Sequence, residues 1–205
     1  MTQTDDNLKE AFAGESQANR RYTFFAEKAE KEGLKQVARL FRAAAEAETV
    51  HARNHFNAMD GVGSSIDNIS AGVIGEHLEF TRMYPGFIDK AEEEGNNRAQ
   101  KSFEYANQVE EIHYNMYQEM LKKVKAKQPI KDEPYYVCPV CGNTVAGNAP
   151  DVCPICGTPG SKFKKIDGVR ESDSFPHLMY YQHLFGGKRQ IFHHLHQVII
   201  IQAAG

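Results

Sequence analysis

The stretch EAETVHARNH, residues 46–55, decides how the chain folds and what its interior holds. Glu48 and His51 are three residues apart, so a helix places them on one face. That face continues an apolar stripe that contains Phe41 and Ala44, and such a stripe points into the core of a folded protein. A carboxylate and an imidazole therefore lie where apolar side chains are expected.

The stretch VEEIHYNMY, residues 109–117, repeats this arrangement with Glu110 and His113. Two other helical stretches contribute carboxylates without a histidine. Glu15 lies on the apolar side of the first stretch, and Glu76 and Glu79 lie in the third. Each predicted helix therefore points a carboxylate inward near its middle.

The helical periodicity predicts a mainly α-helical fold whose first part is a four-helix bundle. Ser70 is expected to cap the third helix, after a loop at 61–69, and Pro85 is expected to kink it. The four helices are predicted at residues 5–32, 34–59, 70–94 and 97–127.

The clustered carboxylates need positive charge. Two like charges about 4 Å apart repel by about 4 kcal/mol at an effective dielectric constant of about 20. Two divalent metal ions would supply four positive charges to offset the charge of these carboxylates. A donor set of many carboxylates and few imidazoles favours iron or manganese over zinc. The pattern matches the carboxylate sites of ferritin-like bundles. His55 and His77 are interpreted as packing or surface residues.

All four cysteines fall in a short segment rich in glycine and proline. Cys138-Pro-Val-Cys141-Gly and Cys153-Pro-Ile-Cys156-Gly form two C-x-x-C pairs, and this spacing predicts a tetrahedral four-thiolate metal site. The glycine after each pair permits a tight turn. The motif does not choose between zinc, which would make a structural ribbon, and iron, which would make a one-electron carrier.

Composition excludes several classes of protein. The 205 residues include 24 Lys and Arg and 27 Asp and Glu, giving a net charge of −3, so nucleic acid is not expected as a partner. No apolar run of roughly 18 residues occurs, so no membrane-spanning helix is expected. The polar start MTQTDDNLKE has no signal-peptide core, which predicts a cytoplasmic protein.

These features together resemble the rubrerythrin family over about residues 5–167. The resemblance is carried by AFAGESQANRRY (11–22), EAETVHARNH (46–55), AGVIGEHLEFTRMYPGF (71–87), VEEIHYNMY (109–117) and the two cysteine pairs. It implies a ferritin-like diiron bundle at 1–127, a linker at 128–134 and a rubredoxin-like domain at 135–168. The implied cofactors are two non-haem irons in the bundle and one iron in the four-cysteine site.

The resemblance also implies roles for individual residues. Glu48 and Glu110 would bridge the two irons, and His51 would replace Glu79 on one iron when the site is reduced. Tyr22 and Tyr84 would hydrogen-bond near the carboxylates. The implied metal ligands are Glu15, Glu48, His51, Glu76, Glu79, Glu110 and His113, with Cys138, Cys141, Cys153 and Cys156 at the second site.

The activity implied is reduction of hydrogen peroxide to water in defence against oxidative stress. Electrons would come from a reduced pyridine nucleotide through a reductase, often via rubredoxin. The expected assembly is a homodimer or a larger homo-oligomer, with the rubredoxin-like centre of one chain near the diiron site of the other. The alternatives are a ferroxidase that handles iron, and an electron-transfer or zinc-binding protein without peroxidase activity. No function is predicted for the extension at 169–205.

Overall fold

The computed structural model describes residues 2–168. The described chain is mostly helical and divides after Asn68 into two compact units, which are taken in turn. The extension at 169–205 lies outside the described residues.

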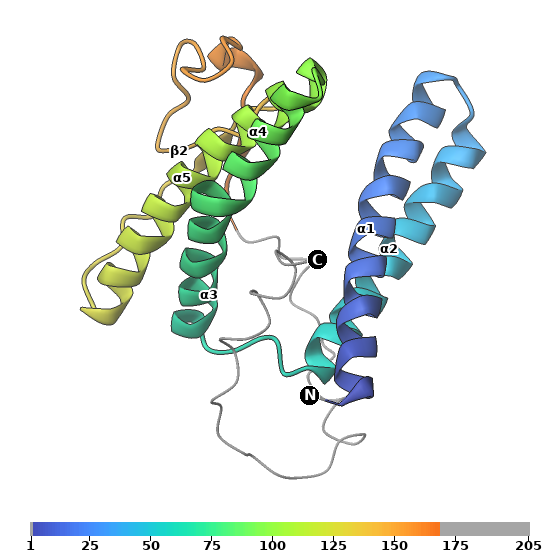
Figure 1. Cartoon of the computed structure of the whole chain (residues 1–205), viewed down its shortest axis with the longest axis horizontal. Helices are drawn as coiled ribbons and strands as arrows, with labels where there is room; N and C mark the ends of the chain where they lie inside the picture. Colours follow the sequence, from blue (N-terminus) through green and yellow to red (C-terminus); the bar gives the residue numbers. More distant parts are fainter. Residues whose placement is uncertain (1, 169–205) are drawn as a thin grey trace. The chain divides into compact units, whose positions relative to one another are not determined.

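The first unit is a hairpin of two long helices, α1 (Gln3–Lys31) and α2 (Lys35–Ala58), which run side by side in Figure 1. Thr2 and Asp5 begin α1 with a capping box, in which each side chain bonds the backbone N–H of the other residue. Gly33 makes the turn between the helices with a positive φ of 76°, a conformation that glycine adopts without steric cost.

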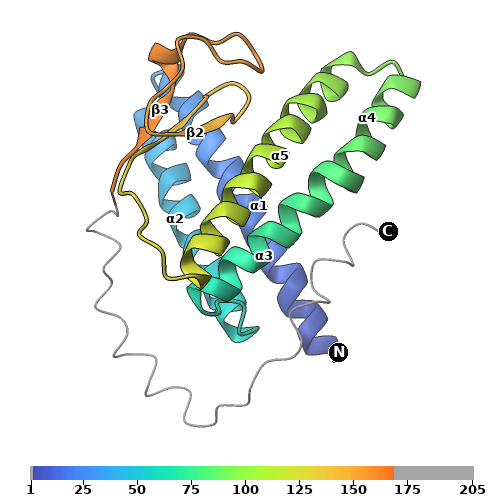
Figure 2. The ribbon, with the colours of Figure 1, turned by 90° about the vertical axis from the view of Figure 1, so that its left-hand side faces the viewer.

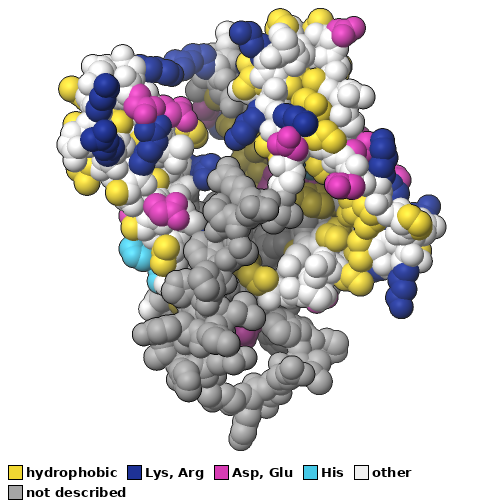
Figure 3. Space-filling model, turned by 180° about the vertical axis from the view of Figure 1, so that it is seen from behind, with side chains coloured by type: hydrophobic (Ala, Val, Ile, Leu, Met, Phe, Trp, Pro, Cys, Tyr) yellow, Lys and Arg dark blue, Asp and Glu magenta, His cyan; other side chains and the backbone are white. Residues whose placement is uncertain are grey.

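Small residues line the contact between α1 and α2. The buried residues of both helices are all alanines: Ala18, Ala26, Ala29, Ala38 and Ala45. Large apolar side chains such as Phe24 and Leu40 remain exposed, and the space-filling view shows hydrophobic and charged side chains side by side on the face it draws (Figure 3). Alanine contacts bring the backbones of the two helices close together.

A continuous helical rod follows, made of α3 (Ser65–Leu78), η1 (Glu79–Met83) and α4 (Tyr84–Glu93). Its first residues belong to the first unit and the rest to the second. The prediction that Ser70 caps this rod was wrong. Ser64 and Asp67 bond each other's backbone N–H groups one turn earlier, so the helix includes most of the loop that was expected at 61–69. A capping pair of this kind needs a serine followed three residues later by an acidic side chain, as at 64–67.

The segment η1 is π-helical. The backbone N–H of Tyr84 donates to the carbonyl of Glu79, five residues back, which inserts an extra residue into the helix. Pro85 follows in the first turn of α4, where its missing N–H is tolerated. The irregularity that was expected at Pro85 is thus a π-helical segment just before it, and such segments often occur at functional sites.

Helix α5 (Asn97–Lys125) runs alongside this rod, as Figure 1 and Figure 2 show from two directions. Asn96 caps it by accepting from the backbone N–H of Ala99. Gly72 lets the helices approach, since a Cβ there would lie 3.2 Å from the ring of Tyr117. Two aromatic groups also join the helices: His77, Phe80 and Tyr114; and Tyr84, Phe87 and Phe103.

A small three-stranded antiparallel sheet follows, in the order β2-β1-β3. Its strands are β1 (Tyr135–Val137), β2 (Thr144–Ala146) and β3 (Lys164–Ile166), with a 3-10 turn η2 (Gly160–Lys162) before β3. Its buried core consists of Cys138, Cys141, Cys153 and Phe163, and Tyr105 of α5 packs against it. We call residues 135–168 the four-cysteine module.

Among the described residues, no helix has both the length and the apolar character needed to cross a membrane.

Candidate metal centres

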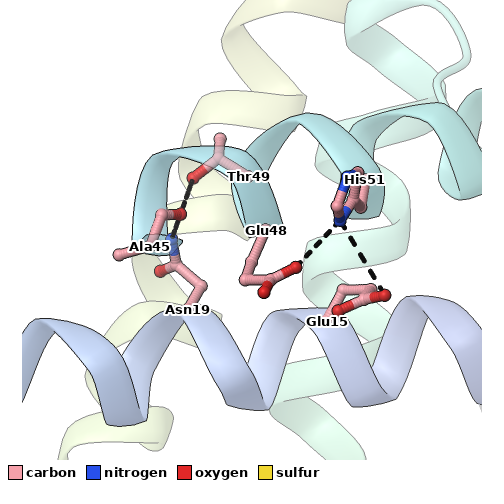
Figure 4. Close-up of polar contacts among 6 residues, drawn as sticks. All are labelled: Glu15, Asn19, Ala45, Glu48, Thr49 and His51. Atoms are coloured by element: carbon pink, nitrogen blue, oxygen red, sulfur yellow. Dashed lines mark hydrogen bonds and ion pairs between the residues drawn. The ribbon is translucent and has the colours of Figure 1, made fainter. Parts of the chain in front are cut away.

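The first unit brings together Glu15 from α1 with Glu48 and His51 from α2. Their ligand atoms all lie within 4.8 Å of one another. The Nδ1 atom of His51 is 2.9 Å from Oε2 of Glu48 and 4.0 Å from Oε1 of Glu15 (Figure 4). Two carboxylates and one imidazole thus converge on one point, as their positions on the apolar stripes predicted.

A polar contact that was not predicted holds the two helices in register beside this group. The side-chain amide of Asn19 donates to the carbonyl of Ala45 at 2.7 Å and to the hydroxyl oxygen of Thr49 at 2.8 Å (Figure 4). Asn19 is one helical turn after Glu15, and Thr49 follows Glu48 directly. A polar residue one turn from an inward glutamate was the signal in the sequence that could have identified Asn19.

The second unit brings together Glu76 from α3 with Glu110 and His113 from α5. The Nδ1 atom of His113 is 2.8 Å from Oε2 of Glu110 and 3.8 Å from Oε1 of Glu76. The other ring nitrogen, Nε2, is 2.9 Å from the hydroxyl oxygen of Thr144 in β2. The side chains of Glu76 and Glu110 are only 18% and 17% exposed, so this group is shielded from water.

Burial and crowding alter the electrostatics of the second group. Burial, and next the charge of Glu110, raise the pKa of Glu76 to about 7. The pKa of Glu79 is raised for the same two reasons. The hydrogen bond that Nδ1 of His113 donates to the carboxylate of Glu110 raises the pKa of His113, and the charges of Glu110, Glu76 and Glu79 add to this effect. The group therefore favours positive charge at its centre, which a proton or a metal ion can supply.

Glu79 and Tyr84 border the second group without belonging to its three converging ligands. Both lie at the π-helical segment, where the backbones of the two residues are hydrogen-bonded. The pKa of Tyr84 is raised by burial and then by the charges of Glu110, Glu79 and Glu76, so its hydroxyl stays protonated beside the carboxylates.

Three other predicted residues have simpler surroundings. Tyr22 contacts Phe25 and Phe41 through its ring, and its hydrogen bond near the carboxylates stays a prediction. His77 packs against Phe80 and Tyr114, which fits its interpretation as a packing residue. Among the described residues, neither His55 nor His77 joins a group that could hold a metal ion.

The four cysteines form a third group. Cys138 and Cys156 have their sulfur atoms 3.5 Å apart, as do Cys141 and Cys153, which is too far for a disulfide. A metal–sulfur distance of about 2.3 Å gives tetrahedral edges of about 3.8 Å, close to these separations. The predicted four-thiolate geometry is therefore present.

The turns around the cysteines have the conformation that the glycines predicted. Gly142 and Gly157 have φ values of 84° and 76°, and each donates its N–H to the carbonyl of the first cysteine of its pair. Burial raises the pKa of Cys141, whereas hydrogen bonds from Thr158 lower the pKa of Cys156 to about 6. A bound metal would remove this difference in protonation, because metal binding deprotonates all four thiols.

The donor sets define the class of protein. Carboxylates and imidazoles on long helices suit hard or borderline metals such as iron, and a closed set of four thiolates suits iron or zinc. The chain is thus a helical metalloprotein that combines a carboxylate–histidine centre with a separate tetrathiolate centre.

Comparison with known proteins identifies the family within this class. The family profile described as Rubrerythrin matches residues 6–121, and the profile for the rubrerythrin rubredoxin-like domain matches residues 136–164. Rubrerythrin-2 of Clostridium acetobutylicum is 35% identical over 78% of this chain and 95% of its own length. Rubrerythrin of Porphyromonas gingivalis is 36% identical over 80% and 90% of the two chains. The chain belongs to the rubrerythrin family.

A solved structure, the mixed-valence state of nigerythrin, aligns over 80% of this chain and 87% of its own, with 35% identity and a TM-score of 0.47. The predicted fold class, a mainly α-helical ferritin-like bundle followed by a rubredoxin-like domain, is confirmed. The predicted cofactors also agree with the family and with the four-cysteine group: two irons in the bundle and one in the rubredoxin-like site.

Proposed function

We propose that the protein is a non-haem diiron peroxidase that reduces hydrogen peroxide to water, with electrons passing through its rubredoxin-like iron. The observation that carries this proposal is the position of the four-cysteine module. It packs on α5, the helix that presents Glu110 and His113, so a one-electron centre lies beside part of the carboxylate site. A protein that only stores iron has no need of such a neighbour.

In this proposal the seven residues that the family resemblance implies as ligands would together hold the two irons. Glu15, Glu48 and His51 come from the first unit, and Glu76, Glu79, Glu110 and His113 come from the second. Each group alone has too few ligands to hold two irons. Together they supply five carboxylates, two of which, Glu48 and Glu110, would bridge.

When bound, the iron pair supplies the two electrons that cleavage of the peroxide O–O bond requires. The residues of the chain have the remaining tasks. The carboxylates neutralise the metal charge, and the protonated hydroxyl of Tyr84 can donate a hydrogen bond to an oxygen in the site. His51, whose side chain is 53% exposed, would replace Glu79 as a ligand when the site is reduced, as the family resemblance implies.

The wider setting is part of the same proposal. The domain boundaries are residues 1–127, 128–134 and 135–168, with an extension at 169–205. The electron donor is rubredoxin or an NAD(P)H-dependent reductase, the assembly is a homodimer or larger, and the compartment is the cytoplasm.

A kinetic comparison tests the function. Fully reduced protein, with three irons counted per chain, is mixed with hydrogen peroxide or with O2, and the oxidation rates are measured. We expect peroxide to react much faster than O2. Faster reaction with O2, followed by release of Fe(III), would favour the ferroxidase alternative and overturn the peroxidase assignment.

A further inference from the structure

A polar side chain is buried among the sulfur atoms of the four-cysteine module. Asn143 is 1% exposed, and it is the one buried polar residue in the part of the chain that the structure describes. Cys138 and Cys153 are buried to nearly the same degree. The side-chain amide nitrogen of Asn143 lies 3.7 Å from the sulfur of Cys153. A hydrogen-bond donor therefore faces one of the four metal-binding sulfur atoms.

The oxygen of the same amide gains nothing from this burial. Within residues 2–168, Oδ1 of Asn143 has no hydrogen-bond partner, and an unpaired polar atom in a protein interior is unfavourable. A leucine has the same number of side-chain atoms and would leave no polar atom unpaired. The contact of the N–H group with sulfur is therefore the feature of this side chain that favours asparagine at the position.

A metal at the four cysteines determines which end of the amide faces the sulfur. A cysteine that binds metal is deprotonated, so its sulfur can only accept a hydrogen bond. The amide oxygen is also an acceptor and would be repelled by the thiolate, whereas the NH2 group of asparagine supplies two donors. The N–H group of Asn143 is thus the end that suits Cys153 in the metal-bound module.

The backbone of Asn143 holds this donor in place. The carbonyl of Asn143 accepts from the backbone N–H of Cys138 at 2.9 Å, and the backbone N–H of Asn143 is hydrogen-bonded to the sulfur of Cys141. These contacts fix the residue on the first cysteine pair. Its side chain then reaches across to Cys153 of the second pair, so one residue contacts both halves of the site.

Thr158 occupies the corresponding position in the second turn, two residues after Cys156. Its carbonyl accepts from the backbone N–H of Cys153 at 2.8 Å, as Asn143 does for the first pair. Its hydroxyl oxygen lies 3.1 Å from the sulfur of Cys156, in its own pair, and the residue is only partly buried. The two turns are thus built alike, and the fully buried donor that crosses between them belongs to Asn143.

A hydrogen bond to a thiolate ligand does not affect the two oxidation states of iron equally. Fe(III) with four thiolates carries one net negative charge, and Fe(II) carries two, because one electron enters and no bond is made or broken. A donor stabilises the more negative ferrous state more strongly, and hydrogen bonds to sulfur are among the factors that set the potentials of such centres. The buried surroundings of Asn143 strengthen the effect.

We propose that Asn143 raises the reduction potential of the four-thiolate iron by donating a buried hydrogen bond from its side-chain amide to the sulfur of Cys153. A higher potential makes the module a better acceptor of an electron from its donor. The inference needs only iron at the four cysteines. Its failure would leave the peroxidase proposal intact, and failure of the peroxidase proposal would leave this inference intact.

The test compares two substitutions of asparagine by leucine in the full-length, iron-loaded protein. Asn143→Leu removes the buried amide, and Asn148→Leu makes the same change at an exposed position of the module. The visible bands of the four-thiolate Fe(III) are followed while the applied potential is varied. At the wild-type midpoint we expect the ratio of Fe(II) to Fe(III) to be about tenfold lower in Asn143→Leu, which corresponds to about 59 mV for a one-electron couple. Asn148→Leu should remain close to wild type.

Two outcomes of this titration would overturn the inference. The first is an unchanged or higher potential in Asn143→Leu when the visible bands show an intact four-thiolate site. The second is an equal fall of the potential in Asn148→Leu, which would mean that the amide facing Cys153 has no special effect. Peroxide takes no part in the measurement, so the result does not depend on the activity of the protein.

A measurement on the unmodified protein remains decisive if Asn143→Leu does not fold. Cadmium-113 is placed at the four cysteines of nitrogen-15-labelled protein, and NMR detects couplings between cadmium and protons that are hydrogen-bonded to its sulfur ligands. We expect such a coupling for a side-chain amide proton of Asn143. The backbone N–H groups of Asn143 and Thr158, which are hydrogen-bonded to the sulfur atoms of Cys141 and Cys156, serve as internal controls. Couplings from these backbone groups without one from the side chain would overturn the inference.

Discussion

Glu76 and Glu79 occupy different positions in the second group, although their sequence spacing places both on the same helix face. Glu76 and Glu79 lie one turn apart, yet only Glu76 converges with Glu110 and His113. Glu79 begins the π-helical segment and acts on the group through its charge. This placement suits a ligand that can leave one iron, because its absence does not dismantle the remaining ligand set.

Replacing Glu79 tests this role. We expect Glu79→Ala to retain two irons in the bundle and to reduce peroxide about tenfold more slowly, which corresponds to about 1.4 kcal/mol of transition-state stabilisation. His51→Ala should instead destabilise the diferrous form and lower the reduction potential of the iron pair. Exposed Glu111 provides the matched control, and Glu111→Ala should behave as wild type. Wild-type peroxide rates in Glu79→Ala at full iron occupancy would refute the role of Glu79 as an exchanging ligand.

The raised pKa of Glu76 predicts a pH dependence for the metal-free protein. The folded state holds a proton on Glu76 up to about pH 7, whereas the unfolded chain releases it near its usual value of 4.5. Between these values the folded state binds more protons, so the free energy of unfolding falls as the pH rises. The melting temperature of metal-free protein should therefore decrease between about pH 5 and about pH 8.

Glu76→Gln removes this titration and provides the control. Its melting temperature should change less over the same pH range, because the amide stays neutral in both states. Bound metal should reverse the trend in the wild type, since metal competes with protons for the carboxylates. An equal slope in metal-free wild type and Glu76→Gln would show that Glu76 does not hold the extra proton.

At the scale of elements, the four-cysteine module depends on its metal to a degree that the helices do not. Three of the four residues in its buried core are cysteines, and its strands have three residues each. A core of this kind cannot exclude water unless a metal joins the sulfur atoms.

Removal of that metal should therefore unfold the module selectively. We expect a strong chelator under reducing conditions to unfold the module, so that the amide NMR signals of residues 135–168 lose their dispersion and move to random-coil positions. The circular dichroism of the helices should largely persist. The native protein should be red from thiolate-to-Fe(III) charge transfer, and the colour should be lost on reduction. A metal-free module with native-like chemical shifts would contradict this expectation, and a colourless protein with one zinc per chain would identify a structural ribbon.

The sequence predicted what depends on spacing and missed what depends on tertiary contact. Three-residue spacing on apolar stripes identified both carboxylate–histidine groups, and the cysteine spacing identified the tetrathiolate site. Helix starts were less predictable, because Ser64 and Ser70 both resemble caps and only the acidic residue at 67 distinguishes them. The contact of Thr144 with His113 joins residues 31 positions apart, and no local pattern indicates such a pair.

At the scale of the whole molecule, the candidate metal ligands are divided between two compact units. The first unit has one carboxylate–histidine group, and the second has the other group together with the four thiolates. The extension at 169–205 lies outside the matched family segments. Removing it should leave peroxidase turnover and iron content nearly unchanged, as measured with the full-length protein as reference. A large loss of turnover in the shortened chain would assign a role to the extension.

The relay itself is tested by changing the metal in the four-cysteine site and leaving every side chain in place. Zinc takes the same tetrahedral thiolate geometry as iron but has no redox chemistry, so it preserves the module and its contact with His113 while stopping electron flow. We expect zinc-substituted protein with an iron-loaded bundle to be oxidised once by peroxide at the normal rate, since that step uses electrons already stored in the iron pair. Steady-state turnover with NADH and the reductase should then fall by at least an order of magnitude, because the oxidised pair is no longer re-reduced through the module. The single-turnover rate is the internal control, and its loss would mean that zinc had also entered the bundle. Normal steady-state turnover with zinc at the four cysteines would show that electrons reach the iron pair by another route, and the module would then be structural.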